Sequence, residues 1–131
     1  MRFRIPLIIL LLLSTTAVVC PQHRGRAWLH GTWEGTGYQI DSDTTWTMRL
    51  RVQGNRYMIE YPSLKCGGRW KPLRLSSGSA RFREKITVGL EACTDKGIVV
   101  VERLSRTQIA FRYSNRGTTE VTASAILNRK K

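Results

Sequence analysis

The chain has 131 residues, of which 22 are Lys or Arg and 9 are Asp or Glu, so its formal net charge is +13. This length accommodates one hydrophobic core of ordinary size, which excludes a multidomain enzyme and a repeat array. Apolar residues make up 41% of the chain, a fraction too high for an intrinsically disordered protein despite the charge.

The first twenty residues have the pattern of an export signal. Arg2 and Arg4 precede the uninterrupted apolar run 7–13, which is too short to span a bilayer by itself. We therefore predict a signal peptide over residues 1–20. Cys20 is a candidate lipidation site if this segment is a lipoprotein signal, and an uncleaved N-terminal anchor is the remaining alternative.

The rest of the chain is expected to form one exported domain. We predict a flexible basic leader over residues 21–30, a β-barrel domain over 31–128 and a basic tail over 129–131. Without residues 1–20 the net charge is +11. The expected location is periplasmic or extracellular, with membrane anchoring only through Cys20.

The cysteines agree with export. Cys66 and Cys93 are the only two after residue 20, and an oxidising compartment allows them to pair. A zinc site would need more ligands, and the two histidines, His23 and His30, have no metal-binding spacing. We therefore predict one structural disulfide and expect no metal and no cofactor.

The clearest strand pattern runs from residue 44 to residue 61. Apolar and polar side chains alternate along this segment, and Gly54-Asn55 interrupts it with the sequence of a two-residue type II′ turn. Pairing Gln53 with Arg56 predicts the register Val52–Tyr57, Leu50–Ile59 and Met48–Tyr61 on the apolar face, with Arg49 opposite Glu60 on the polar face.

Similar patterns predict eight strands and no convincing helix. The segments between them are short and turn-like, which favours antiparallel pairing of successive strands in an up-and-down meander. Closing this meander into a barrel would remove its two exposed edges. The expected strands are 32–39, 44–53, 56–61, 69–75, 80–88, 98–103, 108–113 and 119–127.

The strand order also bears on the cysteines. In a meander, alternate connections lie at opposite ends, so the third and the fifth connections share an end. Cys66 lies in the third predicted connection and Cys93 in the fifth, which makes their pairing geometrically natural. An open sandwich with the same strand order would satisfy this condition too.

Four short blocks of sequence resemble known families. Gly31-Thr32-Trp33 resembles the Gly-x-Trp opening of lipocalin-type and avidin-type barrels, in which the tryptophan closes one barrel end. Residues 35–39, 61–68 and 82–86, the last followed by Gly89 and Cys93, resemble a small bacterial domain found in exported proteins and attached to larger ones, including Ser/Thr kinases. This second resemblance covers most of residues 31–113 and implies an architecture and a paired cysteine, not a reaction.

We find no set of side chains that would support catalysis, so the chain is predicted not to be an enzyme. A Ser-His-Asp relay needs a positioned histidine, and the two present lie near the N-terminus. Glu84 is the notable carboxylate because its alternation places it on the apolar face. An inward glutamate needs a partner, and the predicted register sets Lys71 opposite it. We expect this ion pair, with a ligand-contacting role for Glu84 as the alternative.

Positive charge dominates the predicted outer face. Arg49 and Arg51 lie on it in the second strand, and Arg81, Arg83 and Lys85 in the fifth. Dispersed charge commonly serves solubility alone. A net charge of +11 also attracts an anionic envelope surface or an acidic partner protein, in a manner sensitive to salt, and we expect no specific nucleic-acid partner.

Aromatic side chains leave the state of the barrel interior open. Trp33, Tyr61 and Trp70 would either fill the core or line a barrel mouth for a small ligand. The sequence therefore predicts an exported, nonenzymatic binding module that engages an anionic envelope component or a partner protein. The alternatives are an inhibitor of an extracellular hydrolase, whose loop 61–68 plugs a cleft, and a small-ligand carrier if the barrel is hollow.

Overall fold

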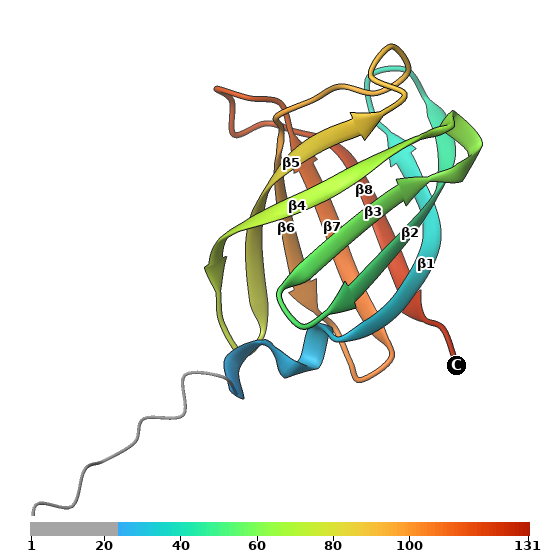
Figure 1. Ribbon diagram of the computed structural model, residues 1–131. Coiled ribbons are helices and arrows are strands. Elements are labelled where there is room, and N and C mark those ends of the chain that lie inside the picture. The colour runs from blue at the N-terminus through green and yellow to red at the C-terminus, as the bar shows by residue number, and fades with distance from the viewer. Residues whose placement is uncertain (1–23) are drawn as a thin grey trace, which may run out of the picture.

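The computed structural model describes residues 24–131, which form a closed barrel of eight antiparallel strands (Figure 1). Each strand pairs with the next along the chain, and β8 also pairs with β1, so the sheet has no free edge. The predicted all-β, up-and-down barrel is thus confirmed. The predicted signal peptide and the Cys20 lipidation site lie outside the described residues. The strands are β1 (Gly31–Gln39), β2 (Thr44–Gln53), β3 (Arg56–Tyr61), β4 (Cys66–Leu75), β5 (Ser79–Val88), β6 (Ile98–Arg103), β7 (Gln108–Ser114) and β8 (Val121–Arg129).

Strand alternation places the apolar side chains inside, and the β2–β3 hairpin has the predicted register. Val52 lies opposite Tyr57, Leu50 opposite Ile59, and Arg49 opposite Glu60. The turn residue Gly54 has a φ of +60°, a backbone conformation that favours glycine. A shift of one residue would have turned the apolar face of this hairpin towards solvent.

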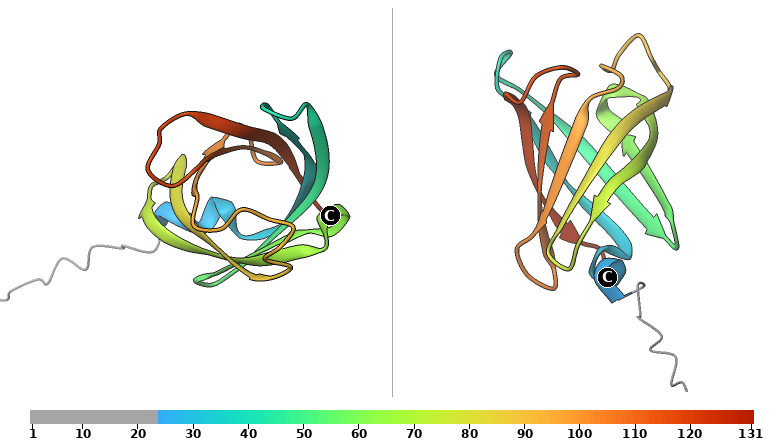
Figure 2. Two further views of the ribbon diagram at one scale, coloured as in Figure 1. Left: turned by 90° about the horizontal axis from the view of Figure 1, so that it is seen from above. Right: turned by 90° about the vertical axis from the view of Figure 1, so that its left-hand side faces the viewer.

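The two ends of the barrel differ. The lower end in Figure 1 carries the 3-10 helix η1 (Arg24–Leu29) and the short β2–β3, β4–β5 and β6–β7 turns. The upper end carries the other four connections, including the 3-10 helix η2 (Pro62–Leu64) and the long β5–β6 loop. Seen down the barrel from the upper end, η1 lies across the far opening (Figure 2).

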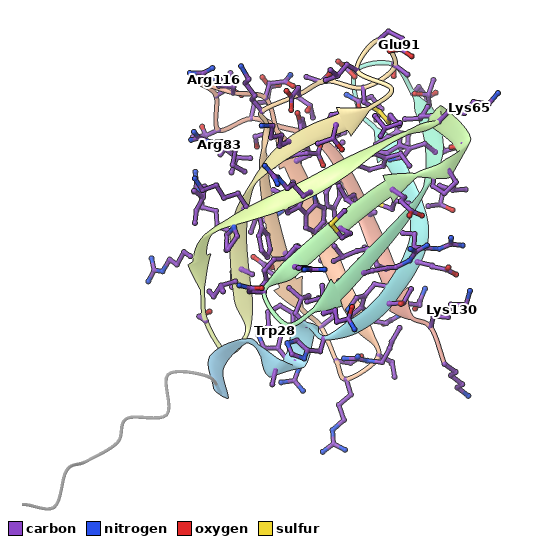
Figure 3. The ribbon with its side chains drawn as sticks, in the orientation of Figure 1. Trp28, Lys65, Arg83, Glu91, Arg116 and Lys130 are labelled. Atoms are coloured by element: carbon purple, nitrogen blue, oxygen red, sulfur yellow. A yellow bond between two sulfur atoms is a disulfide. The ribbon has the colours of Figure 1, made fainter. Side chains whose placement is uncertain are left out.

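The N-terminal segment seals the lower end. Leu29 and Trp33 are fully buried, and Trp33 Nε1 donates a hydrogen bond of 2.9 Å to the Leu29 carbonyl oxygen. Arg129 lies 4.1 Å from the centre of the Trp33 ring and donates to the carbonyl oxygen of Trp28, the residue labelled at the lower end in Figure 3.

Two predicted boundaries are therefore wrong. Residues 24–30 form a plug instead of a flexible leader, because the apolar side chains of Trp28 and Leu29 cover the open end of the core. Arg129 is the last residue of β8 and not part of a free tail.

Aromatic side chains fill the middle of the barrel. The Phe82 ring lies 4.8 Å from Tyr57 and 5.4 Å from Trp70, centre to centre, and Trp70 stacks on Phe111 at 5.8 Å. Tilted and stacked arrangements at these distances are favourable for aromatic pairs. This layer separates the sealed lower end from the upper end.

The β4–β5 pair contains a bulge that the sequence did not reveal. Its register shifts between Pro72 and Arg74, which leaves Leu73 as an extra residue. Consequently Trp70 lies opposite Glu84, and Lys71 lies opposite Arg83 on the outer face. The predicted Lys71–Glu84 ion pair is wrong, because beyond the bulge the register of β4 against β5 is shifted by one residue.

The predicted disulfide is confirmed. Cys66 and Cys93 are bonded, with their Cα atoms 6.3 Å apart. Cys66 begins β4, and Cys93 lies in the β5–β6 loop, so the bond ties this loop to the upper rim of the barrel. Within residues 24–131, no helix has the length and apolar character needed to cross a membrane.

Candidate functional site

A cavity of about 430 Å³ opens at the upper end of the barrel. Its walls come from β1, β2, β3, β5, β7, β8 and the β5–β6 loop, and Phe111 of the aromatic layer belongs to its lining. The barrel interior is thus packed in its lower and middle parts, and this cavity lies above them. Pockets for small molecules commonly have volumes of about 300–1,000 Å³.

Glu84 of β5 is the central polar group of this cavity. It is only 3% exposed, as its alternation predicts, and it lines the cavity. Tyr61 Oη donates to Glu84 Oε2 over 2.5 Å, and Trp70 Nε1 donates to the same oxygen over 2.7 Å. Both bonds are made to Oε2.

Burial controls the ionisation of these groups. It raises the pKa of Glu84 to about 7, although the hydrogen bonds from Tyr61 and Trp70 act in the opposite direction. Burial also raises the pKa of Tyr61 well above 10 and that of Tyr113 to about 12, and the nearby Glu84 carboxylate raises both further. The two phenols therefore stay neutral near pH 7, where Glu84 changes its charge.

Two further side chains of the cavity lining carry a buried hydrogen-bond donor without an acceptor among the described residues. Trp46 Nε1 and Tyr113 Oη are buried, and no described residue accepts a hydrogen bond from either. Both side chains line the cavity. An unsatisfied buried donor costs about 1–3 kcal/mol.

Glycines make room for these two side chains. A Cβ atom at position 37 would lie 2.5 Å from the Trp46 ring, and one at position 97 would lie 2.0 Å from the Tyr113 hydroxyl oxygen. Gly37 belongs to β1, and Gly97 ends the β5–β6 loop. Small residues at these positions thus permit the indole and the phenol to lie where they do.

The raised pKa of Glu84 gives a testable dependence of stability on pH. The folded state holds the Glu84 proton up to about pH 7, whereas the unfolded state releases it near 4.5. The folded state therefore binds more protons between these values, and the free energy of unfolding falls as pH rises through this window. The expected loss is about 3 kcal/mol. Urea denaturation across the pH range measures it.

The Glu84→Gln variant isolates this contribution. Glutamine keeps the size of the side chain and does not titrate, so the difference in unfolding free energy between the two proteins should change by about 3 kcal/mol across the window. Parallel curves for the two proteins would contradict the assigned pKa.

The structure separates the residues selected from the sequence into three groups. Tyr61 and Glu84 line the cavity, and Trp70 bonds Glu84 from the aromatic layer. Trp33 lies at the sealed lower end, away from the cavity. The last group lies on the outside of the barrel and comprises Arg49, Arg51, Lys71, Arg81 and Arg83.

Tyr113 is among the cavity residues that were not selected from the sequence. Tyr113 continues the inward alternation of Ile109 and Phe111 along β7, which is the signal that places it at the upper end of the interior. The surroundings of its hydroxyl include the β5–β6 loop. The alternation of apolar and polar residues carries no information about these neighbours. Within residues 24–131, no cluster of three or more His, Cys, Asp or Glu side chains could hold a metal ion.

Comparison with known proteins supports the fold. No family model and no curated protein matches the chain. Among solved structures, a redesigned β barrel, b11L5F_LGL, matches with a TM-score of 0.62 and 18% identity, over 84% of this chain and 98% of the other. The structure of EF1p2_mFAP2b bound to DFHBI matches with a TM-score of 0.56 and 17% identity, over 82% and 98% of the two chains. At these identities the likeness concerns the barrel architecture alone.

Proposed function

We propose that this protein is an exported, nonenzymatic binding module that holds one small molecule in the upper end of its barrel. One observation carries the proposal: the buried Glu84 and two side chains with donors that have no acceptor among the described residues, Trp46 and Tyr113, line a cavity of about 430 Å³. Such a cavity with a few convergent polar groups is the usual form of a small-molecule site. The Cys66–Cys93 bond agrees with an exported location, because disulfides persist in oxidising compartments.

The polar groups define the chemistry of the ligand. Trp46 and Tyr113 offer hydrogen-bond donors, so the ligand carries an acceptor. Glu84 Oε1 accepts from a donor, and its charge above about pH 7 favours a cation over an anion. Aromatic side chains around these groups favour a flat or apolar body. The ligand class is therefore a small aromatic or apolar amine or a neutral polar aromatic compound.

Two probes with the same ring system and opposite charge test this chemistry. Tryptamine is a cation and indole-3-acetate is an anion, and each is titrated into the protein at about pH 8, where Glu84 is ionised. Tryptamine should bind more tightly and should shift the indole N–H resonance of Trp46 in NMR spectra. Glu84→Gln should weaken tryptamine binding by about tenfold, because a charged hydrogen bond is lost.

A variant that fills the cavity serves as the matched control. Ala123 of β8 is buried and lines the cavity, so Ala123→Phe should abolish binding while leaving Glu84 and its partners in place. Tighter binding of indole-3-acetate, or tryptamine binding that survives Ala123→Phe, would reject the proposed site.

A further inference from the structure

The outer face of the β4–β5 pair carries six cations in three directly opposed pairs. Arg69 lies opposite Lys85, Lys71 opposite Arg83, and Arg74 opposite Arg81. All six side chains are exposed, and Figure 3 shows Arg83 projecting away from the barrel. Like charges directly opposite each other in a sheet are destabilising. We name these six residues the cation ladder.

Three arginines on β2 and β7 are ion-paired, in contrast to the ladder. Arg49 contacts Glu34 over 2.6 Å and Glu60 over 3.6 Å, and Arg51 contacts Glu60 over 3.3 Å. Arg112 of β7 likewise pairs with Glu102 of β6. None of the ion pairs within residues 24–131 involves a member of the cation ladder. The ladder is thus a contiguous group of cations without ion-pair partners in the described part of the chain, whereas other such cations, among them Arg106 and Arg116, lie in loops.

Apolar side chains accompany the ladder. Met58 of β3 lies opposite Arg69, and the extra residue of the bulge, Leu73, lies between Pro72 and Arg74. Both are 47% exposed. On the other flank, the half-buried Ile98 and Val100 of β6 lie opposite Arg83 and Arg81. The residues directly opposite the ladder on the two neighbouring strands are therefore apolar, and the carboxylates Glu60 and Glu102 lie two residues further along these strands.

From this combination we infer that the β4–β5 wall docks on the surface of an anionic phospholipid bilayer. Headgroup phosphates balance the opposed cations, and Met58 and Leu73 enter the interfacial layer. A soluble polyanion would satisfy the charges but would make no use of the apolar side chains. Basic residues near an anionic bilayer contribute about 1 kcal/mol each. This docking is independent of the proposed ligand cavity, because the ladder lies on the outer wall.

The test compares charge reversal inside and outside the ladder. Residues 24–131 form a closed barrel with its own core and disulfide, so this segment is used and the apolar run 7–13 adds no membrane affinity. Binding is measured by cosedimentation with vesicles of phosphatidylglycerol and phosphatidylcholine at low salt. The control has the same charge change in two loops, Arg106→Glu/Arg116→Glu.

The ladder variant is Arg69→Glu/Arg83→Glu, in which each new carboxylate faces Lys85 or Lys71 across the strands. Partition onto the vesicles should fall by about 100-fold, against less than about threefold for the control. Its melting temperature should be equal to or above that of the wild type, because two repulsive cross-strand pairs become attractive. Equal losses for the ladder and control variants would overturn the docking surface.

A third variant separates a bilayer from a soluble polyanion. Met58→Ser/Leu73→Ser keeps every charge and should weaken vesicle binding by about tenfold, since apolar side chains no longer enter the interface. Its binding to inorganic polyphosphate should be unchanged. Vesicle binding that is insensitive to both serines would overturn the bilayer as the partner, as would the absence of wild-type binding to anionic vesicles.

Discussion

Replacing Trp33 with alanine is expected to lower the free energy of unfolding by about 3–5 kcal/mol. Trp33 is fully buried at the sealed end of the barrel, bonds the Leu29 carbonyl oxygen and lies beneath the Arg129 guanidinium. Its loss leaves a void in the lower core. It also removes the contacts of the indole with Leu29 of η1 and with Arg129 at the end of β8. Equilibrium denaturation in urea measures the change.

Two matched variants identify the origin of this loss. Trp33→Phe keeps an aromatic ring but not the indole donor, so it should lose less than the alanine variant, about 1–2 kcal/mol. Ile126→Ala removes a side chain of β8 that is 47% exposed and should change stability by less than about 0.5 kcal/mol. If Trp33→Ala and Ile126→Ala were equally stable, Trp33 would not seal the core.

Removing the disulfide should have an effect of similar size. The Cys66→Ser/Cys93→Ser variant frees a closed segment with a sequence separation of 27 residues. In the chain-entropy description, the lost constraint on the unfolded state lowers the free energy of unfolding by about 3–4 kcal/mol. Because the disulfide ties the β5–β6 loop to the upper rim of the barrel, its removal should accelerate amide hydrogen exchange in this loop.

Chemical reduction provides the control for this prediction. Dithiothreitol should lower the stability of the wild type to that of the double-serine variant and leave the variant itself unchanged. A wild type that keeps its stability after complete reduction would show that the bond does not constrain the unfolded chain as described.

The two proposed activities occupy different parts of one barrel. The cavity opens at the upper end, whereas the cation ladder follows the side wall formed by β4 and β5. A barrel that docks through this wall would therefore leave the cavity mouth accessible. The ligand probes and the vesicle assay can be applied to the same variants, and Ala123→Phe should affect only the first.

The sequence by itself determined the strands, their order and much of their register. Apolar and polar residues alternate with a period of two, so Glu84 had to point inward and Arg81 and Arg83 outward. The Gly54-Asn55 turn then fixed the β2–β3 pairing, and short connections fixed the meander. The same order brought the connections of Cys66 and Cys93 to one end, where their disulfide forms.

Only the tertiary structure decided which partners these side chains meet. The bulge at Leu73 exchanges Lys71 for Trp70 opposite Glu84, and it places Lys71 opposite Arg83 and Arg69 opposite Lys85. Trp28 and Trp33 contact Arg129 at the end of β8, about a hundred residues away in sequence, so no local pattern reveals the plug. The cavity likewise exists because the side chains of several strands leave the upper interior unfilled. Alternation assigns a face to each residue, whereas packing between distant strands determines what fills the space between those faces.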